Sequence, residues 1–274
     1  MNVIESLIYG LISGLTEFLP VSSFGHQTIL KLLIGVNHAE PLRDILIHTS
    51  MLLAIIVCCG TYIEKLRRGQ KISSRSRRAR HIDNSNAYDL RLIKSAALPM
   101  LILMLLKLFA GNLSDNLALV ALFFIGNGLI IYIPDHWPHS NKDARNMSAL
   151  DSFVMGLFGA LAFLPGFSRV GCMMSCAIAR GANKQKAFSW VLVLSIPAII
   201  LLLIMDFISI FSVGIGVLSF QIILGYILSA IMAFVSSCCG IYIMQFITVR
   251  SGIAPFGFYC WGMALLSFIL YLTA

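Results

Sequence analysis

The 274-residue chain is 58% hydrophobic and only 12% charged, with a mean hydropathy of +0.88. Soluble domains carry about 25% charged residues, and the apolar residues of this chain come in runs of membrane-spanning length, so a soluble domain is excluded. The net charge of +8 is concentrated in residues 64–81, a pattern more typical of a cytoplasmic loop than of a nucleic-acid-binding patch.

The first segment, residues 1–35, is apolar but is interrupted midway by the polar stretch SGLTEFLPVSSFGH at 13–26. It starts with MNVIESLIYG, which carries Glu5 in place of a basic region, so we expect it to be retained and not cleaved as a signal peptide. Residues 151–182 are interrupted in the same way by Gly, Pro and polar residues. Both segments are predicted to be pairs of half-helices that enter the membrane and return.

Six continuous apolar runs are predicted to cross the membrane as helices, since about 20 apolar residues span the hydrocarbon core. They lie at 44–63, 91–109, 117–133, 187–209, 217–246 and 253–272. The seven cysteines all lie in apolar segments and lack the spacing of a zinc site or a disulfide framework, so no metal site is predicted from them. The fold class is therefore an all-α polytopic membrane protein with about six transmembrane helices.

The charge of the loops supports the re-entrant interpretation of 151–182. If that segment returns to its starting side, the basic loops at 64–90, 134–150 and 180–186 share one side, as the positive-inside rule requires. The loops at 110–116 and 209–219 contain no Lys or Arg and fall on the outer side, with both termini.

The two interrupted segments also resemble each other, with FLPVSS at 18–23 and FLPGFS at 163–168. Each is followed by three predicted spans. We therefore expect one membrane domain, 1–274, built from inverted repeats 1–133 and 151–274 that are joined by a cytoplasmic linker at 134–150. Such repeats bring their broken helices together near the middle of the bilayer.

The polar residues of these two segments favour phosphate chemistry. Pro20 and Pro165 break the helices, and the N-terminus of each following helix can bind phosphate, with Arg169 as a guanidinium fork. Ser23 could attack phosphorus, with His26 one helical turn away as its base. Glu17 could orient the imidazole or move a proton. The predicted catalytic residues are Glu17, Ser23, His26 and Arg169, and the predicted phosphate-binding residues are Ser22, Ser168, Arg169 and Gly171. The structural alternative is a Glu17–Arg169 pair that only links the two repeats, with hydroxyl groups that cap the half-helices.

GLTEFLPVSSFGH followed by LPGFSRVG resembles the undecaprenyl-diphosphate phosphatase family, the bacitracin-resistance membrane proteins. The resemblance extends over the whole chain and includes HTSMLLAIIV, KAFSWVLVLSIP and PFGFY. It implies an inverted repeat with two re-entrant hairpins, and hydrolysis of the diphosphate of the C55 lipid carrier on the outer face. It also implies functional roles for Glu17, Ser23, His26 and Arg169.

The chain departs from the family pattern at several polar positions. Ser13 stands where the family usually has an acid, Phe24 where it has threonine, and Cys260 where an arginine commonly follows the tyrosine. Val170 and Met173 replace two hydroxyl residues of the second motif. These departures leave two functions open: an attenuated phosphatase, and a non-hydrolytic polyprenyl-phosphate binder, transporter or flippase.

The resemblance implies a polyprenyl diphosphate substrate, contact with membrane lipids and no nucleic acid. It further implies a bacterial plasma membrane location with the active site opening to the periplasmic side. A divalent cation is left open. So is a homodimer, because the small-residue face of Gly225, Ser229 and Ala233 could pack on a partner subunit or within one chain.

Overall fold

Short helical hairpins alternate with long helices along the chain. The computed structural model describes residues 3–36, 39–75, 85–105, 113, 116–136, 140–214 and 218–273, and its regular elements there are helices. The first half contains α1 (Val3–Phe18), α2 (Ser23–Ile34), α3 (Pro41–Arg75), α4 (Ser85–Met104) and α5 (Leu117–Tyr132). The second half contains α6 (Ala149–Ala160), α7 (Arg169–Ala179), α8 (Lys184–Val213), α9 (Phe220–Arg250) and α10 (Pro255–Thr273). The predicted all-α class is confirmed.

Both interrupted segments form pairs of short helices, as predicted. The first hairpin is α1 and α2, and the second is α6, a 3-10 turn at Leu161–Phe163, and α7. Pro20 and Pro165 lie in the two connections, because a proline inside a helix removes a hydrogen bond and clashes with the preceding turn. A serine N-cap starts each returning helix, Ser22 for α2 and Ser168 for α7.

Among the described residues, five helices are long and apolar enough to cross a membrane: Pro41–Arg68, Leu117–His136, Lys184–Ser212, Phe220–Thr248 and Pro255–Thr273. Each corresponds to one of the predicted runs. The remaining run, 91–109, forms α4, whose first half is more polar because it carries Asp89, Arg91 and Lys94. Residues 106–112 of that run and of the next loop lie outside the described residues, as do 76–84, 114–115, 137–139 and 215–217 of the predicted loops.

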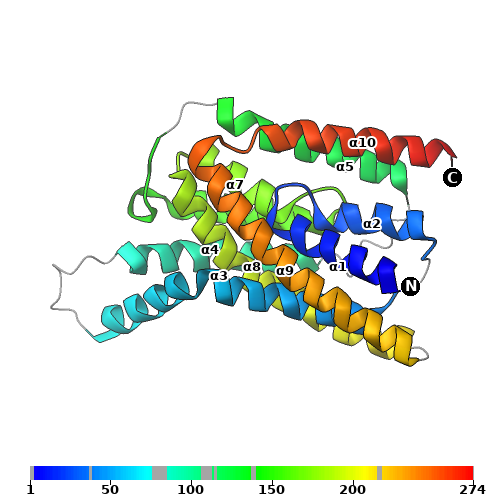
Figure 1. Cartoon of the computed structure of the whole chain (residues 1–274). Coiled ribbons are helices and arrows are strands. Elements are labelled where there is room, and N and C mark those ends of the chain that lie inside the picture. Colours follow the sequence, from blue (N-terminus) through cyan, green and yellow to red (C-terminus); the bar gives the residue numbers. More distant parts are fainter. Residues whose placement is uncertain are drawn as a thin grey trace.

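The helices pair in a pattern that is the same for both halves. The long helices that directly follow the hairpins, α3 and α8, pack on each other, and so do the last helices of the halves, α5 and α10. The middle long helix of each half packs on the first hairpin helix of the other half, α9 along α1 and α4 along α6 (Figure 1). Each of these contacts thus has its counterpart in the other half.

Small residues allow α1 and α9 to pack closely. A Cβ on Gly10 would clash with the carbonyl group of Ser229, and a Cβ on Gly14 with that of Ala233. The face of α9 that contains Gly225, Ser229 and Ala233 therefore packs within the chain, against α1.

Both termini lie at one end of the molecule, and the ends of α3 and α4 that contain Arg67, Arg68 and Arg91 lie at the opposite, basic end (Figure 1). At the basic end, the Lys142 ammonium donates to the Arg180 carbonyl oxygen at 3.1 Å, and Lys184 pairs with Asp135 at 2.7 Å. The C-terminal end of α8 and the N-terminal end of α9 lie at the other end.

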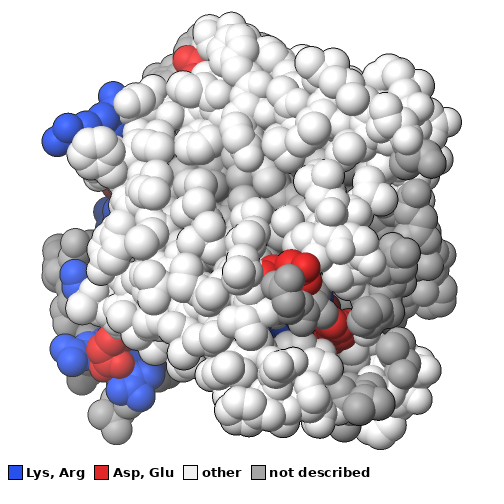
Figure 2. All heavy atoms as spheres, turned by 45° about the vertical axis from the view of Figure 1, so that its right-hand side comes forward, with Lys and Arg blue, Asp and Glu red and all other residues white. Residues whose placement is uncertain are grey.

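The surface between the two ends is largely uncharged. Figure 2 shows Lys and Arg at one edge of such a face. Acidic side chains lie in a hollow of this face, beside the basic group at its edge, and at one point near the top. Large apolar side chains in the middle of the long helices, such as Val57, Ile231 and Leu265, are exposed, as expected for helices that face lipid.

Candidate active site

A serine hydroxyl holds the turn of the first hairpin. Ser22 has a φ of 69°, a left-handed conformation that residues other than glycine rarely adopt. Its hydroxyl oxygen accepts the N–H of Gly25 in its own helix at 3.2 Å and the N–H of Gly166 in the second hairpin at 3.1 Å. Such conformations persist where the surroundings enforce them, and they cluster at functional sites. Ser22 therefore fixes the two turns against each other.

A side chain from α5 clamps both turns. Asn127 is fully buried; its Oδ1 accepts the Ser168 N–H at 2.9 Å and its Nδ2 donates to the Pro20 carbonyl oxygen at 3.4 Å. The Ser168 hydroxyl also donates to the Leu19 carbonyl oxygen at 3.2 Å. The sequence reasoning missed Asn127, although it is the only amide side chain within the apolar run 117–133.

A cavity of about 160 Å³ lies between the two hairpins and the helices α3 and α8. Its described lining includes polar side chains from five helices or their caps: Glu17, Ser23, Gln27, Lys31, Asp44, His48, Ser168, Arg169 and Asp206. Glu17, Ser23, Ser168 and Arg169 were predicted as site residues, and the structure brings these four together. The other polar lining residues were not predicted.

An ion pair joins the two hairpins at this cavity. Arg169, the first residue of α7, donates from Nη2 to Glu17 Oε1 near the end of α1. The side chains are only 5% and 10% exposed, respectively. In the described part of the chain, the Nε of Arg169 is buried without a hydrogen-bond partner. A buried donor without a partner costs about 1–3 kcal/mol, so this N–H favours the binding of an anion.

Ser23 lies in the cavity wall at the start of α2. Its hydroxyl donates to the Ser13 carbonyl oxygen at 3.3 Å and accepts from the Gln27 amide at 3.1 Å. The Ser13 hydroxyl is buried, and no described residue bonds to it. The described hydrogen bonds of Ser23 include no imidazole or carboxylate that would activate it as a nucleophile.

The predicted contact between His26 and Ser23 is not formed. His26 Nδ1 lies 2.7 Å from the Ser22 carbonyl oxygen, and Nε2 lies 2.8 Å from the Tyr259 hydroxyl. The imidazole stacks on the Tyr259 ring and meets the Phe124 ring edge-on. Glu17, the predicted orienting partner of His26, is paired with Arg169 instead. Helical spacing correctly placed His26 one turn from Ser23, but the aromatic partners on α5 and α10 turn its ring away from the cavity.

Two residues predicted to bind phosphate do not line the cavity, because their hydrogen bonds stabilise the hairpins. Ser22 caps α2 as described above, and the Gly171 N–H donates to the Ser168 hydroxyl oxygen at 3.1 Å. Val170 and Met173, which replace the family's hydroxyl residues, are fully buried in the apolar core. These two departures therefore contribute packing where the family pattern would contribute polar groups.

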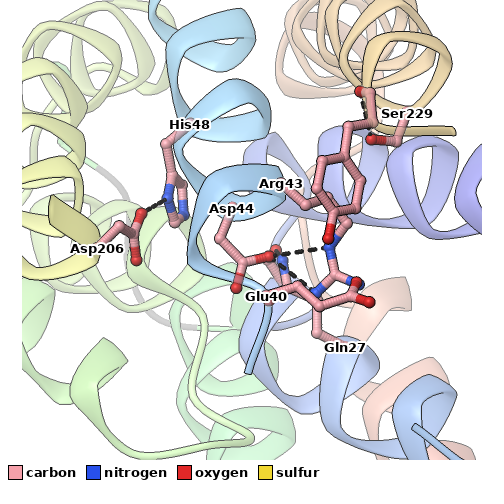
Figure 3. A network of polar contacts seen from close by, with 9 residues as sticks. Gln27, Glu40, Arg43, Asp44, His48, Asp206 and Ser229 are labelled. Carbon is pink, nitrogen blue, oxygen red and sulfur yellow. Dashed lines mark hydrogen bonds and ion pairs between the residues drawn. The ribbon is translucent and has the colours of Figure 1, made fainter. Parts of the chain in front are cut away.

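A second group of polar side chains reaches the cavity from α2, α3 and α8 (Figure 3). His48 Nδ1 lies 2.6 Å from Asp206 Oδ2, and Lys31 and Asp44 line the same cavity. The sequence reasoning missed this group. Its signals were Asp44 and His48 one turn apart at the start of a span, and Asp206 as the only acid within α8.

Arg43 fixes the start of α3 against the first hairpin. Its guanidinium is fully buried, pairs with Glu40, and donates from Nε and Nη2 to Asp44 Oδ1 at 3.1 and 2.9 Å. It also lies over the Tyr9 ring of α1, 3.9 Å from the ring centroid. Asp44 is thereby held at the cavity wall by a cation from its own helix.

Within the described part of the chain, no three His, Cys, Asp or Glu side chains are close enough together to hold a metal ion.

These features define a helical integral membrane protein with a polar cavity, lined by a buried arginine, where two broken helices meet. The chain belongs to the BacA family: the family model described as bacitracin resistance protein BacA matches residues 6–266. This confirms the resemblance seen in the two motifs.

Curated relatives align over most of the chain. Undecaprenyl-diphosphatase 3 of Bacillus cereus is 26% identical over 275 aligned residues, covering 100% of this chain and 99% of the relative. The undecaprenyl-diphosphatase of Thermosipho africanus is 28% identical and covers 96% of this chain and 98% of its own length. That of Prochlorococcus marinus is 31% identical, with 78% and 82% covered.

Proposed function

We propose that this protein is a membrane hydrolase that converts undecaprenyl diphosphate to undecaprenyl monophosphate and inorganic phosphate. It thereby recycles the lipid carrier for peptidoglycan and envelope synthesis. The observation that carries the proposal is Arg169, buried at the cavity between the hairpins with an unpartnered Nε. The names of the curated relatives support the same activity.

Arg169 and Ser168 are proposed to bind the terminal phosphate. The guanidinium can offer a phosphate two parallel N–H groups, and the amides of the first turn of α7 have no partner within their helix. Charge-assisted bonds of this kind stabilise the negative charge that develops in the transition state. Ser23, in the same cavity, is proposed to position the phosphate or the attacking oxygen.

Glu17 is proposed to orient Arg169 through their ion pair and to take part in proton transfer. His26 and Ser22 are proposed to act through positioning, because their hydrogen bonds hold the turn of the first hairpin. The Gly171 amide is proposed to act in the same way by fixing the Ser168 hydroxyl.

The membrane arrangement proposed here consists of inverted repeats 1–133 and 151–274 joined by linker 134–150. The reciprocal packing of α9 on α1 and of α4 on α6 supports it. We further propose that the basic end is cytoplasmic and that the cavity opens to the periplasmic side of a bacterial plasma membrane. Lys31 and Asp44 support this opening, since they lie near the helix ends opposite the basic end.

Cysteine labelling in intact cells tests this orientation. In a background without the seven native cysteines, an impermeant thiol reagent should label Leu218→Cys and spare Asn141→Cys. The reverse pattern would contradict the orientation. Labelling of both positions, or of neither, would contradict the re-entrant second hairpin, because a further crossing would place the two positions on the same side.

Phosphate release from undecaprenyl diphosphate by the purified protein tests the activity. We expect turnover by the wild type and its loss in Arg169→Ala. A wild type that binds undecaprenyl monophosphate tightly but releases no phosphate would contradict the hydrolase and favour a carrier. The buried Ser13, in place of an acid, is the feature that makes this alternative worth measuring.

A further inference from the structure

His48 and Asp206 form a hydrogen-bonded pair across two helices at the cavity. His48 lies on α3 and Asp206 on α8, and their side chains point toward each other between these helices (Figure 3). Nδ1 of the imidazole lies 2.6 Å from Oδ2 of the carboxylate, and the side chains are 15% and 20% exposed. Both residues line the cavity that contains Arg169 and Ser23.

The hydrogen bonds fix which nitrogen of each histidine is available. His26 is fully engaged: a carbonyl oxygen can only accept from Nδ1, so Nε2 is left to accept from the Tyr259 hydroxyl. In His48, the carboxylate of Asp206 accepts the Nδ1–H, which places the lone pair on Nε2. Within the described part of the chain, no hydrogen bond occupies this Nε2. His48 is therefore the histidine with an available lone pair at the cavity.

Charged side chains from five helices line the cavity at which His48 lies. Asp206 contacts it from α8, and Asp44 lies one turn before it on α3, held by Arg43. Facing the same cavity are Lys31 from α2, Glu17 from α1 and Arg169 from α7. Glu17 and Arg169 pair with each other, and Asp44 pairs with Arg43. Asp206 and Lys31 are therefore the remaining opposite charges in the described lining of this cavity.

We propose that His48, oriented by Asp206, accepts the proton of the water molecule that hydrolyses the diphosphate. The water oxygen forms a bond to the terminal phosphorus as the bond from that phosphorus to the bridging oxygen breaks. The bridging oxygen keeps the electron pair and leaves as the lipid monophosphate. The water proton passes to His48 Nε2, and the imidazolium later returns it to solvent with the inorganic phosphate. This assignment rests on the proposed hydrolase activity.

The test compares His48→Gln, Asp206→Asn and His26→Gln with the wild-type protein in one detergent. Phosphate release from undecaprenyl diphosphate is measured for kcat and KM across the acidic and neutral pH range. Loss of a general base costs about 100-fold or more in rate. We expect that loss in kcat for His48→Gln, with little change in KM, and loss of the fall in rate toward acidic pH. Asp206→Asn should shift that fall, whereas His26→Gln should retain it.

Two controls separate proton transfer from packing. Imidazole added to His48→Ala should restore part of the rate, an effect that a purely structural histidine would not show. His136→Gln, at the basic end of the molecule, should behave as the wild type. If His48→Gln does not fold, the pH profile of Asp206→Asn and the imidazole rescue still decide the question.

If the wild type is active and His48→Gln has the same kcat and the same fall in rate toward acidic pH, the role of His48 is overturned and the hydrolase proposal is not. Loss of the fall in rate toward acidic pH in His26→Gln would also overturn it, because the base would then be His26. A wild type that releases no phosphate would overturn the hydrolase proposal together with this one.

Discussion

The two hairpins follow one plan but lie in different surroundings. In the first, the left-handed residue of the turn is Ser22 at a φ of 69°, whereas in the second it is Gly166 at 128°. Ten of the 11 residues of α7 are buried, against three of the 12 residues of α2. The second hairpin is therefore a core element, and the first lies at the edge of the core.

Because of this difference, the two hairpins contribute different groups to the site. Burial of α7 holds Arg169 in place, because its neighbours in the core leave it little freedom. The exposed face of α2 instead presents Ser23, Gln27 and Lys31, which are four residues apart and follow one another along the cavity. The second hairpin thus supplies a fixed cation. The first supplies a row of polar side chains along which a diphosphate can extend.

Replacement of Arg169 should have the largest effect on the site. Arg169→Ala should lower phosphate release by about 100-fold or more, and Arg169→Lys should not restore it, because an ammonium cannot form the two-pronged contact. Arg180→Lys is the matched control, since this half-exposed arginine pairs with Asp151 at the basic end. A lysine variant with wild-type affinity for the lipid phosphate would mean that Arg169 acts only as a point charge, or only as a structural link between the hairpins.

Loss of the Asn127 clamp should loosen the two turns together. Asn127→Leu leaves the Ser168 N–H and the Pro20 carbonyl without their partner, at a cost of about 1–3 kcal/mol in the free energy of unfolding. Thermal unfolding and phosphate release should both fall. Asn116→Ala removes the N-cap of the same helix at a cost of about 1 kcal/mol, but should preserve turnover. Equal losses of turnover in both variants would show that Asn127 acts only through global stability.

Restoration of the family's polar groups should raise activity moderately. Ser13→Glu with Val170→Ser adds a carboxylate one turn before Glu17 and a hydroxyl next to Arg169. A tenfold gain in phosphate release requires about 1.4 kcal/mol of added transition-state stabilisation. Initial rates for the wild type, both single variants and the double variant measure it. A fall in rate with unchanged lipid binding would mean that the dry packing at these positions is the functional form.

The strained turn of the first hairpin should give the smallest difference. Ser22→Ala and Ser22→Gly both lose the bonds to Gly25 and Gly166, but only glycine relieves the left-handed conformation. Thermal unfolding should therefore show Ser22→Gly to be more stable than Ser22→Ala by about 1 kcal/mol. Equal stabilities would indicate that the turn relaxes in the variants.

The sequence predicted the features that depend on local pattern. Pro20, Pro165 and the polar residues beside them located both hairpins, and the paired charges of Glu17 and Arg169 located their meeting point. The side-chain partners that come from distant helices could not be predicted, because helical periodicity identifies only the neighbours of a residue on its own helix. His26 finds Tyr259 on α10, and His48 finds Asp206 on α8. A lone polar residue in an apolar span, such as Asn127, was the only local sign of these contacts.

The structure of the protein bound to undecaprenyl monophosphate would test most directly whether both hairpins hold one phosphate. We expect the phosphate oxygens within hydrogen-bond distance of Arg169 Nε, with Ser168 and Ser23 beside them. A phosphate bound elsewhere, with Arg169 still paired only to Glu17, would contradict the proposed site.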